Sequence, residues 1–369
     1  MTIVIFIIIL AGLIFTHELG HFWAAKKFGI RVDEFGFGFP PKLFSVKKGE
    51  TEYSLNLIPI GGFVKIFGEN PDEESETGSD QTRSMVNKPR HIQAIVLAAG
   101  VFLNLVLAWA LFSVSLYVGM PIALADLPTQ TKVTEEKLLI TSIMKDSPAA
   151  ESGLIAGDSI LTLAVDDKKI ILPTIEEVQE FLQTNKNKIV EISYSRGARK
   201  NLKEGVALTM PKLGVVGEKA GIGITMERIG VAKLSFFQSI IMGFKFTCEM
   251  TIATIISFRD FLMSLFVNGG QALSSVAGPI GLFGIVAGIR QLGLIYLINF
   301  TAIISINLAV LNLLPFPALD GGRLLFLIIE AIKGSRLNPK IANSLNALGF
   351  IMLLLLMAVV AVSDILKIV

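Results

Sequence analysis

The 369-residue chain has few charged residues and a single cysteine. Asp, Glu, Lys and Arg together make up 17% of it, where soluble domains have about 25%, and hydrophobic residues make up 52%. This composition excludes an ordinary soluble domain and predicts an integral membrane protein. The lone Cys248 excludes an intramolecular disulfide framework and a zinc site built from cysteines. A net charge of +2 gives no indication of nucleic acid binding, and we expect none.

The N-terminal apolar run, MTIVIFIIILAGLI, lacks the features of a cleavable signal peptide. No basic residue precedes it, and FTHELGHFW (15–23) follows where a small-residue cleavage site would stand. We therefore expect this run to form the first membrane helix.

Four apolar runs are each long enough to cross about 30 Å of hydrocarbon. They are 1–25, 92–119, 294–322 and 347–367. We expect a polytopic α-helical membrane protein with about four transmembrane helices. Lys and Arg cluster in the intervening loops 26–91 and 323–346, so the positive-inside rule places both loops in the cytoplasm. Both termini and the segment 120–290 would then be extracytoplasmic.

The segment 232–290 is amphipathic rather than uniformly apolar. Within it, 235–266 carries Lys245, Glu249, Arg259 and Asp260 among its apolar residues. We expect a helix lying in the membrane interface, in preference to a fifth span.

Residues 122–226 have the character of an inserted α+β domain. Strand patterns alternate with short helices, and Thr174 with Glu177 predicts a capping box before EEVQEFLQT. SPAAESGLIAGDSIL resembles the signature of bacterial PDZ domains, which bind peptide C-termini by adding a strand to a sheet edge. We therefore predict one extracytoplasmic PDZ domain; a generic α+β insert is the alternative.

The cytoplasmic loop 26–91 contains a predicted β-hairpin. Apolar and polar residues alternate on both sides of Lys47-Lys48-Gly49-Glu50. Its apolar content is high for a loop, which predicts that the hairpin is associated with the membrane beside the helices.

The sequence His17-Glu18-Leu19-Gly20-His21 places an H-E-x-x-H motif inside the first apolar run. The i, i+4 spacing puts both imidazoles on one helix face, where they can bind a single Zn²⁺, and Glu18 can take a proton from a metal-bound water. The alternative is a polar patch hydrogen-bonded to neighbouring helices, which would leave ionisable groups in the membrane without a metal to compensate them.

A catalytic zinc needs a third protein ligand and one open position. Asp320, in NLLPFPALDGG (312–322), is the candidate, because the first and third runs both end on the cytoplasmic side. A helix N-cap is the alternative role for Asp320. His91, the remaining histidine, is expected at the membrane interface and not at the metal.

Three further residues of the 312–322 stretch are predicted to position substrate. Pro315 and Pro317 break the helix ahead of Asp320 and free backbone groups. Asn312 offers a side-chain amide that could hold the substrate backbone or a developing oxyanion. A helix–helix hydrogen bond is the alternative role for Asn312.

Together, HELGH, NLLPFPALDGG, the PDZ-like insert, IPIGGFVK and AGPIGLFGI (277–285) resemble the site-2 protease family of intramembrane zinc metalloproteases, and in particular its bacterial regulator-of-sigma-E type. The resemblance covers essentially the whole chain. It implies Zn²⁺ held by His17, His21 and Asp320, with Glu18 as general base and Asn312 positioning substrate. Proteases of the regulator-of-sigma-E type carry two tandem PDZ domains, whereas we find one here.

The resemblance also implies the substrates and the location. Substrates would be single-pass membrane proteins already trimmed by another protease, such as anti-sigma factors or signal-peptide remnants, cut in the lipid bilayer of the bacterial inner membrane. Two other classes of function stay open, a catalytically silent scaffold that binds partners through its PDZ domain and a transporter with broken helices.

Overall fold

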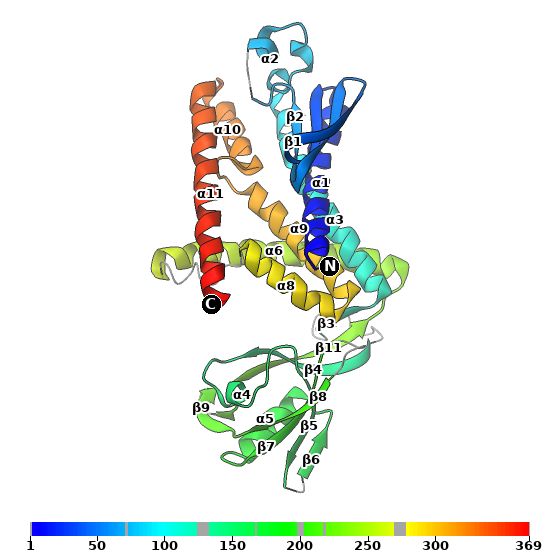
Figure 1. Cartoon of the computed structure of the whole chain (residues 1–369), viewed down its shortest axis with the longest axis vertical. Coiled ribbons are helices and arrows are strands. Elements are labelled where there is room, and N and C mark those ends of the chain that lie inside the picture. Colours follow the sequence, from blue (N-terminus) through cyan, green and yellow to red (C-terminus); the bar gives the residue numbers. More distant parts are fainter. Residues whose placement is uncertain are drawn as a thin grey trace. The chain divides into compact units, whose positions relative to one another are not determined.

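A computed structural model gives the fold of the chain (Figure 1). It describes residues 2–70, 73–123, 133–166, 168–197, 203–216, 219–268 and 278–368. The chain divides into two compact units. The helical unit comprises Met1–Ser113, Ile240–Gly288 and Leu297–Val369, and the sheet unit comprises Val114–Ser239 and Ile289–Tyr296.

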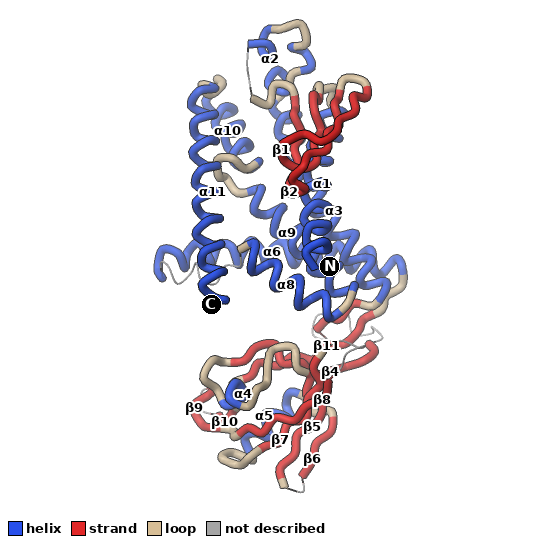
Figure 2. Tube along the Cα trace, in the orientation of Figure 1, coloured by secondary structure: helices blue, strands red, loops and turns tan. Residues whose placement is uncertain are grey.

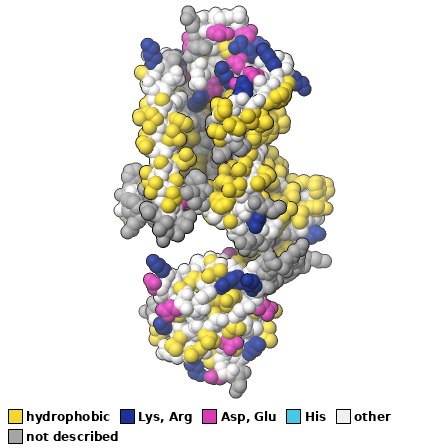
Figure 3. All heavy atoms as spheres, in the orientation of Figure 1, with side chains coloured by type: hydrophobic (Ala, Val, Ile, Leu, Met, Phe, Trp, Pro, Cys, Tyr) yellow, Lys and Arg dark blue, Asp and Glu magenta, His cyan; other side chains and the backbone are white. Residues whose placement is uncertain are grey.

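Five helices in the described part of the chain are long and apolar enough to cross a membrane. They are α1 (Thr2–Lys27), α3 (Arg90–Val118), α6 (Phe236–Asn268), α9 (Leu294–Leu313) and α11 (Pro339–Ile368). On the face shown in Figure 3, hydrophobic side chains are spread along the helical unit, whereas charged side chains gather at the end that carries the hairpin. The chain is therefore a multi-pass membrane protein, and four of these helices fall on the four predicted runs.

Two of the predicted ranges differ from the helices observed. Within 294–322 the predicted break at Pro315 and Pro317 is present, so α9 ends at Leu313 and α10 (Asp320–Lys333) follows. The predicted loop 323–346 is consequently mostly helical, since α10 fills its first half and α11 begins at Pro339 rather than at 347. Proline has no N–H to offer and is favoured at the first position of a helix, which explains both boundaries.

Helix α6 differs in direction from the other long helices. In Figure 1 it runs across the direction of α1 and α11 instead of alongside them. That direction favours the predicted interfacial position, although length and composition alone would also allow α6 to span. Of the remaining predicted interfacial segment, 269–277 lies outside the described residues, and α8 (Pro279–Leu292) follows.

The hairpin predicted in the first loop is present. Strands β1 (Val32–Lys48) and β2 (Thr51–Ile66) pair antiparallel, with Lys48 opposite Thr51 across the turn. Phe35 is paired both with Val64 and with Tyr53, so the first part of β1 lies between the two halves of β2. The segment 62–66 is therefore an edge, and β2 packs beside α1 (Figure 2).

A buried apolar cluster fixes the base of this hairpin to the helices. It joins the end of α1, the ends of the two strands and the start of α3, and its members are Ala25, Ile30, Val32, Ile66, Met85, Val96 and Leu97. The tip of the hairpin is held by Glu50, which contacts Lys26 and Arg83 at 2.6 Å each. The remainder of the loop contains α2 (Glu73–Thr77) and two 3-10 turns, Gln81–Arg83 and Met85–Asn87.

The main sheet of the sheet unit has seven strands, and its neighbouring strands pair antiparallel. The strand order is β3-β11-β4-β5-β7-β8, with β6 paired to β5. The bounds are β3 Met120–Ala123, β4 Val133–Ile143, β5 Ser159–Val165, β6 Lys168–Ile171, β7 Val190–Arg196, β8 Lys203–Thr209 and β11 Ile224–Ala232. A separate pair is formed by β9 (Lys212–Val216) and β10 (Lys219–Gly221).

Two short helices complete the core of the sheet unit. Helix α5 (Ile175–Thr184) has the predicted Thr174–Glu177 capping box and buries Val178, Phe181 and Leu182 among the strands. Helix α4 (Pro148–Glu151) begins after Ser147, whose side chain accepts from the Ala150 N–H.

The observed sheet extends slightly beyond the predicted 122–226 at both ends. Parts of that range, 124–132, 167, 198–202 and 217–218, lie outside the described residues. The unit is an α+β insert, and its assignment as a PDZ domain stays a prediction.

Candidate metal centre

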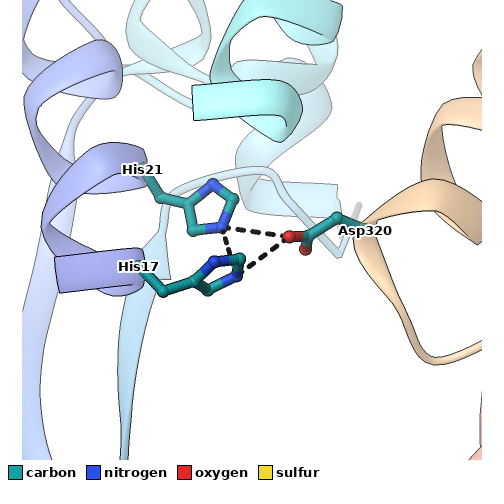
Figure 4. A group of neighbouring side chains, drawn as sticks. All are labelled: His17, His21 and Asp320. Atoms are coloured by element: carbon teal, nitrogen blue, oxygen red, sulfur yellow. Dashed lines mark hydrogen bonds and ion pairs between the residues drawn. The ribbon is translucent and has the colours of Figure 1, made fainter. Parts of the chain in front are cut away.

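His17 and His21 lie one helical turn apart on α1, and their side chains point toward the same place (Figure 4). Residues four apart share a face of an α-helix, which is why the spacing brings the rings together. The two Nε2 atoms are 3.2 Å apart, and both residues are buried.

Asp320 reaches the same place from α10. Its Oδ2 lies 3.0 Å from Nε2 of His17 and 3.3 Å from Nε2 of His21. Asp320 is the first residue of α10, whose N-cap is Leu319, and no side chain caps this helix. The structure therefore does not use Asp320 as an N-cap, and its carboxylate is directed to the histidines instead.

Two glycines explain how Asp320 is brought to this position. A Cβ at Gly321 would lie 2.2 Å from the Leu314 carbonyl oxygen, and one at Gly322 would lie 2.2 Å from that of Phe316. The first turn of α10 consequently packs directly against the broken end of α9. Larger residues after Asp320 would push its carboxylate away from α1.

The three donor atoms fit a zinc ion. Zinc bound tetrahedrally at about 2.0–2.2 Å holds its ligand atoms about 3.3–3.5 Å apart. The distances among the two Nε2 atoms and Oδ2 are 3.0, 3.2 and 3.3 Å, close to that spacing. Oδ2 of Asp320 is buried and accepts no hydrogen bond of good geometry. Two imidazoles and one carboxylate leave a fourth position open, as a catalytic zinc requires.

The orientation of His21 is set by α3. Its Nδ1 lies 2.8 Å from the Val96 carbonyl oxygen, and a carbonyl can only accept, so Nδ1 carries the proton and Nε2 is free for a metal. A Cβ at Gly100 would lie 2.4 Å from Nε2 of His21 and 2.7 Å from Cε1 of His17. Gly100 therefore allows α3 to lie against both rings.

Glu18 faces open space on two sides of the centre. It lines a cavity of about 230 Å³ with Ile14, Leu308 and Asn312, and another of about 340 Å³ with residues of β2. Val64 of β2 lines the larger cavity beside Glu18. A water and a substrate backbone therefore have room beside this carboxylate.

Asn312 lies beside the metal centre, whereas the two prolines do not line its cavities. The Asn312 Nδ2 lies 3.4 Å from Nε2 of His17, and the residue lines the smaller cavity. Pro315 and Pro317 lie in the break between α9 and α10 and are not among the residues that line the two cavities at the centre. The turn they form is held by α11, because the Ala318 N–H donates to Asn346 Oδ1 at 3.2 Å.

An ion pair closes the larger cavity on the side of the hairpin loop. Arg323, one turn after Asp320, pairs with Glu69, and its Nη2 also reaches Asn70 Oδ1 at 3.3 Å. Burial raises the pKa of the Glu69 carboxyl, and the positive charge of Arg323 opposes that rise. The sequence analysis missed this pair, since the two residues are far apart in the chain and only the fold joins them.

His91 lies outside this group. It is exposed near the start of α3, and the described residues that could together hold a metal are His17, His21 and Asp320. Gly100 was also missed, because a glycine in an apolar run has no signal of its own without knowledge of which helix packs against it.

Two histidines one turn apart and a carboxylate from another helix form the donor set of a zinc metalloprotease, with a glutamate beside them, and the histidines lie on a helix apolar enough for a membrane. Comparison with known proteins agrees with this assignment. The chain belongs to Peptidase family M50, whose family model matches residues 5–356. It is an intramembrane zinc metalloprotease.

Curated relatives match nearly the full length. A putative zinc metalloprotease of Clostridium perfringens is 33% identical over 365 residues, covering 99% of this chain and 98% of the relative. Another, of Fusobacterium nucleatum, is 35% identical over 375 residues, covering 100% and 99%. The regulator of sigma-W protease RasP of Bacillus subtilis is 28% identical over 443 residues, covering 99% and 98%.

Proposed function

We propose that this enzyme cuts the transmembrane segments of single-pass membrane proteins that another protease has already trimmed, such as anti-sigma factors or signal-peptide remnants. The observation that carries the proposal is the convergence of three donor atoms at 3.0–3.3 Å, two from His17 and His21 on the membrane-length helix α1 and one from Asp320 at the start of α10. The name of the Bacillus subtilis relative, a regulator of sigma-W protease, supports a membrane-protein substrate in a signalling pathway.

In this proposal His17, His21 and Asp320 hold the zinc, and Glu18 is the catalytic base. Zinc supplies Lewis-acid chemistry, which polarises the scissile carbonyl and lowers the pKa of a bound water. Glu18 takes a proton from the attacking water as its oxygen bonds to the carbonyl carbon. The same carboxyl then gives that proton to the leaving amine as the C–N bond breaks.

A helical substrate must unwind before hydrolysis, because its carbonyls are engaged in their own hydrogen bonds. The hairpin edge 62–66 offers a strand to which the unwound segment adds. Phe63 and Val64 on this edge line the cavity beside Glu18, so a segment paired there lies next to the base. The Asn312 amide, on the other side of Glu18, holds a substrate carbonyl or the developing oxyanion.

Water reaches the centre from the cytoplasmic side. His21 lies five residues before Lys26 and six before Lys27, which is about 8–9 Å of helix rise from the end of α1. The larger cavity is lined by Glu69 of the cytoplasmic loop and by Arg323 of α10, both polar. In a bacterial cell the protein would lie in the cytoplasmic membrane, with its termini and the sheet unit extracytoplasmic.

The sheet unit acts as a filter in this proposal. As a PDZ domain it would bind peptide C-termini and exclude substrates whose extracytoplasmic part has not been removed. Its α+β fold, with α5 packed on a seven-stranded antiparallel sheet, supports this assignment.

The experiment that tests the proposal is cleavage of a truncated single-pass substrate by Glu18→Gln in reconstituted vesicles. We expect the variant to keep its zinc and to lose cleavage by several orders of magnitude, because an amide cannot accept the proton from water. Glu249→Gln, which alters an exposed carboxylate of α6, serves as the matched control and should cleave normally. Cleavage by Glu18→Gln at the control rate would remove the assigned base.

A further inference from the structure

Helix α3 presents three positions, spaced four residues apart, to the two histidines. Val96 accepts from His21 through its carbonyl, and Gly100 gives the rings room. The third position is Asn104, fully buried, whose side-chain amide Nδ2 lies 3.4 Å from Nδ1 of His17. Helix α3 therefore offers one polar group to the Nδ1 atom of each histidine, Val96 to His21 and Asn104 to His17.

We infer that Asn104 is a positioning residue for the metal centre, which fixes the ring of His17 in the form whose Nε2 binds the metal, as Val96 does for His21. The inference rests on the proposed function in that it takes His17 to be a zinc ligand.

The chemistry of the pair decides which end of the amide faces His17. A neutral histidine that binds metal through Nε2 carries its proton on Nδ1, and that N–H needs an acceptor. An Nδ2 facing Nδ1 would set donor against donor. Meanwhile Oδ1 of Asn104 is buried without a hydrogen-bond partner, which is costly inside a protein. Rotating the amide end for end turns Oδ1 to the Nδ1–H and removes both conflicts.

The backbone of Asn104 is held in place independently of the metal. The Ser305 hydroxyl on α9 donates to the Asn104 carbonyl oxygen at 2.8 Å, and Ser305 is fully buried. Helix α9 also carries Asn312, the other amide that approaches His17. The bond from Ser305 therefore holds the backbone from which the Asn104 side chain reaches His17.

The test is zinc affinity, measured by competition with a chelator on folded, detergent-purified protein. Asn104→Leu and Asn104→Ala lack an acceptor, and we expect each to bind zinc roughly 10–100-fold more weakly, as is typical for loss of a partner behind a ligand histidine. Asn104→Asp keeps the acceptor and loses the donor. We expect it to bind zinc within about threefold of the wild type.

Asn299→Leu is the matched control. Asn299 is another amide in α9 with an unpartnered buried oxygen, and it lies about 20 Å of helix rise from Asn312. Its replacement should leave zinc affinity unchanged. His17→Ala separates this inference from the proposed function, since unchanged zinc in that variant would remove the metal site itself.

Two results would overturn the inference while His17→Ala loses zinc. One is wild-type affinity in the Leu and Ala variants. Another is an Asp variant as weak as the Leu variant, which would mean that the amide donates. If the Leu and Ala variants do not fold, the Asp variant decides alone, with retained affinity supporting the inference and lost affinity contradicting it.

Discussion

At the scale of single residues, the metal centre depends on what is missing at Gly100. The absence of a side chain there lets α3 approach both histidine rings, and the same approach brings the Val96 carbonyl to His21. A methyl group would meet Nε2 of His21, which is the atom that faces Asp320. The ligand geometry is therefore set by a residue that has no ligand atom.

We predict that Gly100→Ala weakens zinc binding by about tenfold or more, because the added Cβ displaces a ligand ring. Zinc retention during dialysis against a chelator measures this. Gly12→Ala is the control, since a Cβ at Gly12 on α1 meets no atom within 4 Å. Equal zinc retention in the two variants would show that α3 can shift without cost.

The predicted metal ligands and the predicted base could be found from the sequence. The residues that contact them from other elements could not. His17, Glu18 and His21 follow from spacing on one helix, and Asp320 follows from the direction of two spans. Asn104 and the Glu69–Arg323 pair depend on which faces of separate elements meet. Which faces meet is determined by the packing of the helices and strands, and this packing cannot be read from a single sequence.

At the scale of elements, the position of Asp320 depends on the break between α9 and α10. Pro315 and Pro317 end α9, and the turn after them places Asp320 at the start of α10. The sequence indicated the break, but it offered a helix after Asp320 only through the alternative role of Asp320 as a helix N-cap. The hairpin was easier to predict, since its alternation and its Gly49 turn are local features.

The native Cys248 reports where α6 lies. It is exposed on α6 and is the single cysteine of the chain. If α6 lies in the extracytoplasmic interface, a membrane-impermeant maleimide should label Cys248 from the extracytoplasmic side, whereas at the centre of a span it would be protected.

The matched control for that labelling is Lys47→Cys in a Cys248→Ser background. Lys47 lies at the tip of the hairpin and should be labelled only when the cytoplasmic face is open to the reagent. Protection of Cys248 from both sides would make α6 a fifth span.

At the scale of the whole molecule, the chain joins a membrane-embedded helical unit to a separate sheet unit. Each has its own core, and the metal centre lies within the helical unit. Composition and apolar runs predicted this division. Zinc chemistry should therefore survive removal of the sheet unit.

We predict that replacing 124–228 by a short flexible linker keeps cleavage of a truncated substrate and adds cleavage of the untrimmed one. The remaining β3 and the end of β11 pair next to the joint, so the ends can be connected. Cleavage of both substrates by the same vesicles measures the change. Continued rejection of the untrimmed substrate by an active deletion variant would contradict a filter in the sheet unit.

The central claim is that His17, His21 and Asp320 jointly hold the zinc, and the most direct test is metal analysis of purified protein. We expect about one zinc per wild-type chain and far less in Asp320→Ala, because removal of the carboxylate leaves only two ligands. Asp260→Ala, which changes an exposed carboxylate on α6, should keep full zinc. An Asp320→Ala protein that is folded and carries as much zinc as the wild type, against the same chelator, would contradict the account.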